Sequence, residues 1–185
     1  MWEKDIDINQ VVEIRTRTNV YFGVGAIKKI DDIARVLKTK GIDKVIVMSG
    51  RNAYKATGAW DYVEKALKDN GIGYINYDQV TPNPTTVHVN EAAKMAKDFG
   101  AKAVIAIGGG SPTDAGKSVA ILLEYPEKTA ENIYDFEFAP EKAAPIVSIN
   151  LTHGTGTETN RFAVVTNLEK NFKPAIAYDC IYPMF

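Results

Sequence analysis

Short apolar runs alternate with amphipathic stretches along most of this chain, which leaves few possible folds. Residues 44–48, 74–77, 103–107 and 146–150 are apolar runs typical of buried strands. The stretches between and before them repeat their apolar residues at helical spacing and predict helices over 27–37, 60–70, 87–99 and 113–123. Strands and helices in regular turn favour a parallel sheet with helices on both faces, which is the doubly wound α/β class.

The pattern changes on both sides of this alternation. Residues 11–21 are rich in β-branched and aromatic side chains, which predicts a short hairpin or two edge strands. Residues 162–166 and 174–177 favour two further strands joined by a polar turn at 167–171, with no helix between them. Acids and aromatics mix at residues 134–138, and we expect a surface excursion there.

The length suits one large unit rather than two full domains, because 185 residues exceed the usual domain size of about 100 to 150 by a modest margin. We expect a core over about residues 22–150, followed by a loop and a small β extension over 151–185. The chain ends on apolar and aromatic residues. We expect them to be exposed and adhesive, as at a cut surface: Ile181, Tyr182, Met184 and Phe185.

Composition excludes several classes of protein. Acidic and basic residues nearly cancel, 23 against 22, so no overall field would hold nucleic acid or an anionic membrane. Cys180 is the single cysteine, which excludes an internal disulfide and a cysteine-rich zinc site. No apolar run approaches the roughly 20 residues of a membrane span, and no secretory leader is visible. We therefore expect a cytoplasmic protein with no nucleic-acid or membrane partner.

Residues 105–114, Ile-Ala-Ile-Gly-Gly-Gly-Ser-Pro-Thr-Asp, carry the strongest signal, a strand that runs into three glycines and then a helix. Glycines let a phosphate approach the backbone, and the amides of the helix start donate to it. Ser111 is expected as the N-cap, Pro112 at the first helical position and Asp114 at capping-box spacing. A pyrophosphate site is favoured over a plain glycine-rich turn with an ordinary cap.

A second polar loop, Thr-His-Gly-Thr-Gly-Thr-Glu at 152–158, follows the predicted strand 146–150. Its hydroxyls can donate to ribose or phosphate without filling a crevice. Taken alone it could be an ordinary loop. Two such loops at the ends of two parallel strands favour a shared nucleotide-binding crevice.

Three ordered motifs resemble the signature series of the iron-containing (group III) alcohol dehydrogenases. They are Gly-Gly-Gly-Ser-x-x-Asp-x-x-Lys at 108–117, Thr-x-Gly-Thr-Gly-Thr-Glu at 152–158 and Pro-Asn-Pro-Thr at 82–85. The start of the chain, Tyr-Phe-Gly-x-Gly-Ala at 21–26, is similar as well. The resemblance covers essentially the whole chain. It implies a Rossmann-like N-terminal domain of the dehydroquinate synthase-like fold, which dehydroquinate synthases and glycerol dehydrogenases share with different loops.

The resemblance also implies roles in the glycine loop and the helix that follows it. Gly109, Gly110 and Ser111 would hold the pyrophosphate, and Asp114 would lie on the nicotinamide side of the same loop. The alternative for Asp114 is a simple helix cap. Lys117 is expected to be structural, with a solvated helix lysine as the plain interpretation.

Five residues outside that loop complete the implied cofactor site. Thr152 and Thr155 would bind the phosphate and the nicotinamide ribose, and Phe162 would lie beside the nicotinamide ring. Lys173 would reach a ribose. Asn83 would border the adenosine end.

The family's catalytic metal is held by an aspartate and three histidines of a following helical domain. This chain has only His88 and His153, and neither has metal-ligand spacing to a second histidine or to a cysteine. We expect His88 to be a surface or capping residue and His153 to belong to the ligand loop. No metal site is assigned here, and Fe²⁺ or Zn²⁺ is expected only in the full-length enzyme.

The expected function is hydride transfer between a nicotinamide dinucleotide and an alcohol or aldehyde, with this chain as the cofactor-binding part. Cut off before the metal ligands, it should be inactive alone; its expected partners are the C-terminal helical domain of the same polypeptide and a second copy in a homodimer. The alternative is a stand-alone nucleotide-binding or interaction module. A reading frame with about 200 further residues and spaced histidines would favour the enzyme.

The loop Gly50-Arg51-Asn52, after the predicted strand 44–48, bears on the choice of dinucleotide. Sites for NAD usually place an acid at this kind of strand end, and none is present in the loop. Arg51 offers a planar charged fork suited to a 2′-phosphate, and Gly50 leaves room for it. In the resembled family, glycine and polar residues in this loop accompany use of NADP. NADP is therefore expected, with NAD as the alternative if Arg51 is only a solvated loop residue.

Overall fold

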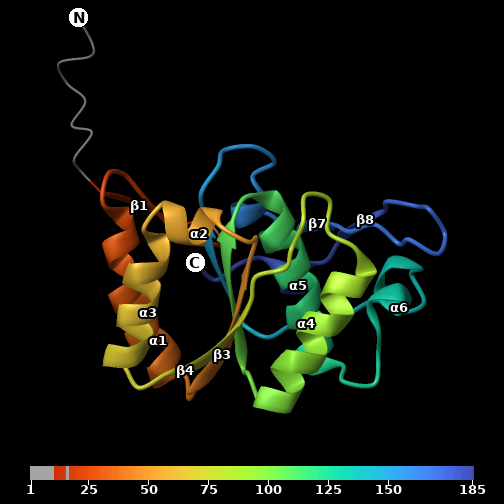
Figure 1. The fold of residues 1–185 in the computed structure, drawn as a ribbon, viewed down its shortest axis with the longest axis horizontal. Coiled ribbons are helices and arrows are strands. Elements are labelled where there is room, and N and C mark those ends of the chain that lie inside the picture. Colours follow the sequence, from red (N-terminus) through yellow and green to blue (C-terminus); the bar gives the residue numbers. More distant parts are fainter. Residues whose placement is uncertain (1–10, 16) are drawn as a thin grey trace, which may run out of the picture.

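The computed structural model describes residues 11–15 and 17–185. Its centre is a four-stranded sheet in the order β4-β3-β5-β6, in which every neighbouring pair is parallel (Figure 1). The strands are β3 (Lys44–Ser49), β4 (Gly73–Tyr77), β5 (Ala103–Gly108) and β6 (Ile146–Asn150). The four predicted strands are confirmed, three of them one residue longer than expected.

Helices cover both faces of this sheet, which confirms the doubly wound α/β class. In Figure 1, α1 and α3 lie on one side of the sheet and α4 and α5 on the other. Their bounds are Ile30–Thr39 for α1, Ala59–Asp69 for α3, Thr86–Phe99 for α4 and Gly110–Glu124 for α5. Three shorter helices complete this set: η2 (Ala26–Lys29), α2 (Ala53–Ala56) and α6 (Ala130–Tyr134).

The two faces of the sheet form two separate apolar cores, because successive side chains of a strand point to opposite faces. Ile46 and Val104 belong to the core under α4 and α5. Val47 and Ile105 belong to the core under α1 and α3. All six residues of β5 are buried, which explains why this strand appears in the sequence as an uninterrupted apolar run.

Small antiparallel elements flank the central sheet. The hairpin consists of β1 (Val12–Arg15) and β2 (Asn19–Phe22), and the extension of β7 (Phe162–Val164) and β8 (Ala175–Ala177). Short 3₁₀ turns precede and follow the extension, η3 (Thr157–Thr159) and η4 (Asp179–Ile181). The predicted hairpin and β extension are therefore both confirmed. Among the described residues, no helix is long and apolar enough to cross a bilayer.

The expectation for residues 134–138 is only partly right. Tyr134 is 1% exposed at the end of α6, and its hydroxyl lies 2.7 Å from the hydroxyl of Ser118 on α5. Phe136, in contrast, is exposed. The mixed composition therefore marks the last turn of a short helix that buries one aromatic ring, followed by a surface turn.

The expectation that the apolar residues at the chain end are exposed is wrong. Ile181 is fully buried, and Tyr182, Met184 and Phe185 are partly buried. The Phe185 ring stacks on Tyr21 of β2 with centroids 6.2 Å apart. Ile181 belongs to the core under α4 and α5, whereas Phe185 packs against the hairpin. The local sequence could not reveal these partners.

Candidate functional site

The polar loops singled out in the sequence gather at one edge of the sheet. All four strands are parallel, so their carboxyl ends share that edge. Residues 50–52 follow β3, residues 78–85 follow β4, residues 109–111 follow β5 and residues 151–156 follow β6. The chain leaves β3 through α3 to β4 and leaves the neighbouring β5 through α5, on the opposite face, to β6. Doubly wound proteins bind ligands at such a switch point.

The N-cap of helix α5 lies two residues earlier than expected. Its N-cap is Gly109 rather than Ser111, and no side chain caps this end. Ser111 lies inside the first turn, so the predicted Ser111 cap and Asp114 capping box are both wrong. Since three glycines let the chain turn directly from β5 into the helix, the first-turn amides are left available to a ligand at the positive end of the helix dipole.

The glycine loop interlocks with the threonine loop. A Cβ atom added to Gly109 would collide with Oγ1 of Thr152, and one added to Gly110 would lie 3.3 Å from Oγ1 of Thr155. Side chains at these two positions would therefore force the Thr152 and Thr155 side chains to shift. The structure thus brings together four of the predicted cofactor-binding residues, Gly109, Gly110, Thr152 and Thr155. Both threonines are exposed to solvent.

Lys117 fastens α5 to the segment that follows the threonine loop. Its buried Nζ donates to Oγ1 of Thr157 at 2.9 Å, to the carbonyl oxygen of Asn160 at 2.7 Å and to that of Phe162 at 2.8 Å. The interpretation as a solvated helix lysine is wrong, whereas a structural role agrees with these contacts. Burial lowers the pKa of Lys117 to about 8, and the nearby carboxylates of Asp114 and Glu158 oppose that shift.

Asp114 completes this buried clamp. Its carboxylate accepts from Oγ1 of Thr157 at 2.6 Å and from the amide of Val164 on β7 at 3.1 Å. Burial raises the pKa of Asp114, and these two hydrogen bonds partly offset the shift. The structure thus shows Asp114 bonded to protein groups, neither capping its own helix nor facing open solvent.

The remaining residues implied by the resemblance lie farther out on the same edge. Phe162 begins β7 with 48% of its surface exposed. Nζ of Lys173 donates to Oδ1 of Asn83 at 2.6 Å, which ties the β extension to the loop after β4. Asn83 has a left-handed backbone, with φ of 59°, a conformation that asparagine tolerates better than most residues.

The loop after β3 is exposed at Arg51 and Asn52. Gly50 lies close to the backbone of the neighbouring loop, because an added Cβ would be 3.2 Å from the carbonyl oxygen of Val80. Sequence reasoning missed a carboxylate here. Asp78 is the first residue after β4, the strand beside β3, and its carboxylate accepts from the hydroxyl of Tyr54 at 3.5 Å. Its position one residue past a predicted strand was the available signal.

Neither histidine belongs to a metal centre within the described chain. His88 closes a capping box at the start of α4, where its Nδ1 accepts from the amide of Thr85 at 3.0 Å. This confirms His88 as a capping residue. His153 is exposed on the threonine loop. No group of three or more histidine, cysteine or acidic side chains suited to a metal ion occurs among residues 11–15 and 17–185.

Comparison with known protein families gives a match to the iron-containing alcohol dehydrogenase model over residues 17–185. The chain belongs to this family. The resemblance seen in the sequence motifs is thereby confirmed, as is the fold it implied.

Individual relatives agree with the family match. A long-chain primary alcohol dehydrogenase of Thermoanaerobacter ethanolicus is 60% identical over the whole chain, which covers 46% of that protein. The crystal structure of an NADH-dependent butanol dehydrogenase of Thermotoga maritima is 33% identical and superposes on 96% of this chain and 43% of its own, with a TM-score of 0.84. This chain therefore spans less than half the length of either protein and corresponds to the N-terminal Rossmann-like part of the family.

Proposed function

We propose that this chain is the cofactor-binding part of an NADP(H)-dependent alcohol dehydrogenase that transfers hydride between the dinucleotide and an alcohol or aldehyde. The observation that carries the proposal is the uncapped start of α5, which faces the threonine loop across two glycines at the switch point of the sheet. The names of relatives, which include a long-chain primary alcohol dehydrogenase and butanol dehydrogenases, support a primary alcohol as the substrate class.

In this proposal, Gly109, Gly110 and Ser111 bind the pyrophosphate. The missing Cβ atoms let phosphate oxygens reach the backbone amides, and the helix dipole favours their negative charge. The exposed hydroxyls of Thr152 and Thr155 donate to the nearest phosphate and to the nicotinamide ribose. The loops can act together because their separation is already set by contact between Gly109 and Thr152.

The nicotinamide end would lie toward β7. Phe162 presents half of an aromatic ring to solvent there, and a flat apolar face suits the nicotinamide. Lys173 and Asn83 are already hydrogen-bonded to one another and can turn their remaining donors to a ribose and to the adenosine end. Asp114 acts indirectly. Its two carboxylate oxygens accept from Thr157 and Val164, and in this way it positions the segment that follows the threonine loop.

The family is named for iron, and the described residues include no group of side chains suited to hold a metal ion. The metal ligands are proposed to come from sequence beyond Phe185, and this chain alone is expected to bind the dinucleotide without turnover.

The preference for NADP(H) is proposed from the loop after β3. Arg51 is exposed and able to pair with a 2′-phosphate, and Asn52 adds a neutral donor, whereas Gly50 lets this loop approach the carbonyl oxygen of Val80 closely. Asp78 acts in the opposite sense, because a carboxylate near the same strand end repels a phosphate. Relatives include both an NADH-dependent and an NADPH-dependent butanol dehydrogenase, so the preferred dinucleotide differs within the family.

Calorimetric titration of NADP⁺ and NAD⁺ tests the preference. We expect NADP⁺ to bind more tightly, and Arg51→Ala to cost about 1.5 to 3 kcal/mol for NADP⁺ with little change for NAD⁺, since one charge-assisted bond is lost. Lys55→Ala is the matched control, because Lys55 is an exposed cation whose Nζ lies over the Tyr54 ring, 5.2 Å from its centroid. Asp78→Asn should tighten NADP⁺ alone. Equal affinities in the wild type, or an equal loss for both cofactors, would contradict the assignment.

A further inference from the structure

The threonine loop, residues 152–156, runs between two anchored segments. Before it, the amide of Leu151 donates at 2.9 Å to the carbonyl oxygen at the end of β5. After it, Thr157 is 3% exposed and accepts from Nζ of Lys117. The loop itself is exposed from Thr152 to Thr155. The positions of its hydroxyl groups therefore depend on how the end of the loop is held.

Asn160 joins this loop to the buried ammonium group of Lys117. Its Nδ2 donates to the carbonyl oxygen of Thr155 at 3.3 Å, and a Cβ atom built on Gly156 would lie 4.0 Å from the same Nδ2. On the other side, Oδ1 of Asn160 accepts from Nζ of Lys117 at 3.3 Å and from the amide of Phe162 at 2.8 Å. One side chain thus bonds both to the exposed loop and to the buried clamp.

The two donors at Oδ1 fix which way the Asn160 amide points. Turning the amide over would place its NH₂ group against the Lys117 ammonium and the Phe162 amide, which are both donors. The hydrogen-bond network therefore assigns the NH₂ group to the side of the Thr155 carbonyl. Asparagine suits this place because it accepts on one side and donates on the other, whereas an aspartate can only accept.

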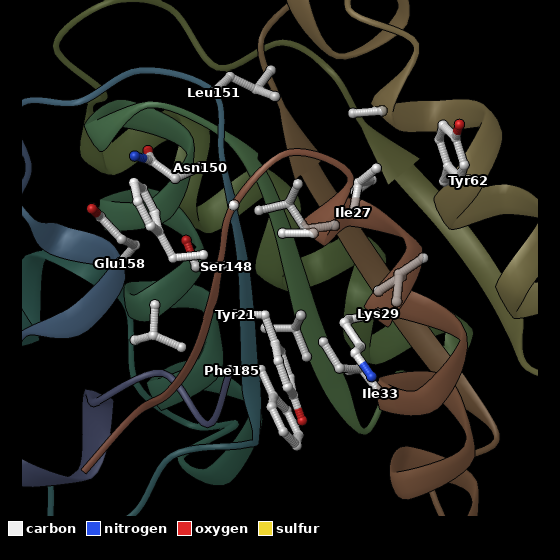
Figure 2. A pocket seen from close by; sticks show the side chains of 18 of the residues that line it. Tyr21, Ile27, Lys29, Ile33, Tyr62, Ser148, Asn150, Leu151, Glu158 and Phe185 are labelled. Atoms are coloured by element: carbon white, nitrogen blue, oxygen red, sulfur yellow. The ribbon is translucent and has the colours of Figure 1, made fainter. Parts of the chain in front are cut away.

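Glu158, the acid next to Thr157, has a different place. It lines the groove between the hairpin and β6, and Figure 2 shows its side chain there. Burial lowers the pKa of Lys117, and the Glu158 carboxylate opposes this shift through space. Thr157 and Asn160 are the side chains that accept from Nζ of Lys117. The bonds from this segment to α5 therefore run through neutral groups.

We propose that Asn160 is a positioning residue of the threonine loop, which holds Thr155 at a fixed distance from the start of α5 and so sets the affinity of the site for its ligand. The hydroxyl of Thr155 faces that helix start, because its Oγ1 lies 3.3 Å from the place of a Cβ on Gly110. Asn160 fixes the carbonyl of the same threonine. The identity of the ligand rests on the proposed function, whereas the hold on the loop does not.

Asn160→Asp isolates this link, because the two side chains have the same shape. The carboxylate keeps an acceptor for Lys117 and for the Phe162 amide, but it loses the donor to Thr155 and places an oxygen against that carbonyl. Calorimetry on the whole gene product should show the Kd for NADP⁺ and for NAD⁺ rising at least about fivefold, since a hydrogen bond that holds the loop is lost. The free energy of unfolding should stay the same or rise. Kd values within about twofold of the wild type would overturn the proposal.

Two further variants and added salt separate the lost bond from the added charge. Asn160→Ala removes the donor without adding charge and should raise both Kd values, although it also lowers stability because the Phe162 amide loses its acceptor. Asn171→Asp makes the same change of charge on the exposed turn between β7 and β8, where aspartate tolerates the left-handed backbone with φ of 45°. It should leave both Kd values nearly unchanged.

Salt screens the added charge but not the position of the loop. In about 1 M salt, where the screening length is roughly 3 Å, the effect of Asn160→Asp should persist. An effect that disappears in salt, an equal weakening in Asn171→Asp, or no weakening in Asn160→Ala would each overturn the proposal.

A spin label on the loop provides a measurement without ligand. His153 is exposed on the threonine loop, so His153→Cys gives a labelling site once Cys180 and any later cysteine are replaced by serine. Electron paramagnetic resonance should show faster nanosecond motion of the label in Asn160→Asp and Asn160→Ala than with asparagine in place. Unchanged motion in both would overturn the proposal. A wild type that binds neither dinucleotide would instead refute the proposed function, and the label would still decide whether Asn160 holds the loop.

Discussion

Helices α4 and α5 lie side by side on one face of the sheet, yet they begin in opposite ways. At the start of α4, Oγ1 of Thr85 accepts from the amide of His88, and the His88 ring accepts from the amide of Thr85 in return. The start of α5 has only Gly109 as its cap and no side-chain acceptor. The protein thus closes one helix end with its own side chains and leaves its neighbour open.

This difference between the two helix starts indicates where an anion-binding site can be expected in an α/β fold. A capped helix end has its amides satisfied, so it contributes stability and offers little to a ligand. An uncapped end contributes less stability but keeps its donors for an anion. Helix α5 is held instead from farther along the helix, by Asp114 and Lys117, which grip the segment from Thr157 to Val164.

The largest expected effect comes from removing that grip. Lys117→Met should destabilise the protein by about 3 to 5 kcal/mol, because it leaves Asp114 and several carbonyl oxygens buried without their cation. Urea unfolding measures the loss. Lys94→Met on α4 is the control, since Lys94 is exposed and its ion pair with Asp98 is screened by solvent and should contribute little to stability. Similar small losses in both variants would show that α5 is not held by Lys117.

The pH dependence of stability in the wild type and in Lys117→Met tests the lowered pKa of Lys117. Because burial lowers the pKa of Lys117 to about 8 from its ordinary 10.5, the folded chain releases this proton at a lower pH than the unfolded chain does. The stability of the wild type relative to Lys117→Met should therefore rise between about pH 8 and 10.5. A difference that stays constant over this range would contradict the shifted pKa.

A smaller effect is expected from closing the gap between the two loops. Gly109→Ala should cost about 1 to 3 kcal/mol of stability and weaken dinucleotide binding at least tenfold, because the new methyl group meets Oγ1 of Thr152. For stability, Gly154→Ala is the matched control, since nothing lies within 4 Å of a Cβ there. Adding Thr152→Ala to Gly109→Ala should restore stability. Failure of that rescue would show that the loops are not in contact.

The smallest effect separates a cap from a binding site. Thr85→Ala should lower stability by about 1 kcal/mol, because the start of α4 loses its capping acceptor. Dinucleotide affinity should not change, since this helix end is already closed by protein groups. Calorimetric binding and chemical unfolding on one preparation measure both quantities. A loss of affinity as large as that of Gly109→Ala would mean that the capped start of α4 also takes part in dinucleotide binding.

Much of this architecture follows from local pattern alone. Buried parallel strands such as β5 are continuous apolar runs, and helices α1 and α3 show their buried face in the spacing of their apolar residues. The candidate loops were also recognisable, because strand ends followed by glycine and hydroxyl residues have few structural uses. Their meeting at one edge then follows from the parallel sheet.

The rest depends on partners that are distant in sequence. Lys117 lies within a helix of mixed composition, and nothing nearby indicates that oxygens from Thr157 and Phe162 surround its amine. Asp78 was overlooked because its relevance comes from the pairing of β4 with β3. The start of α5 was misplaced because Ser111 has the properties of a good cap, whereas the glycines before it allow an earlier turn.

The grip of α5 on β7 also has a consequence for biosynthesis. Asp114 and Val164 are 50 residues apart, and the bond between Asn83 and Lys173 spans 90. Chains emerge from the ribosome N-terminus first, and contacts of long sequence separation are slow to form. The glycine loop and its helix are therefore translated well before the residues that fasten them. A nascent chain that has just completed the fourth parallel strand possesses the open helix end but not yet the segment that fixes it in place.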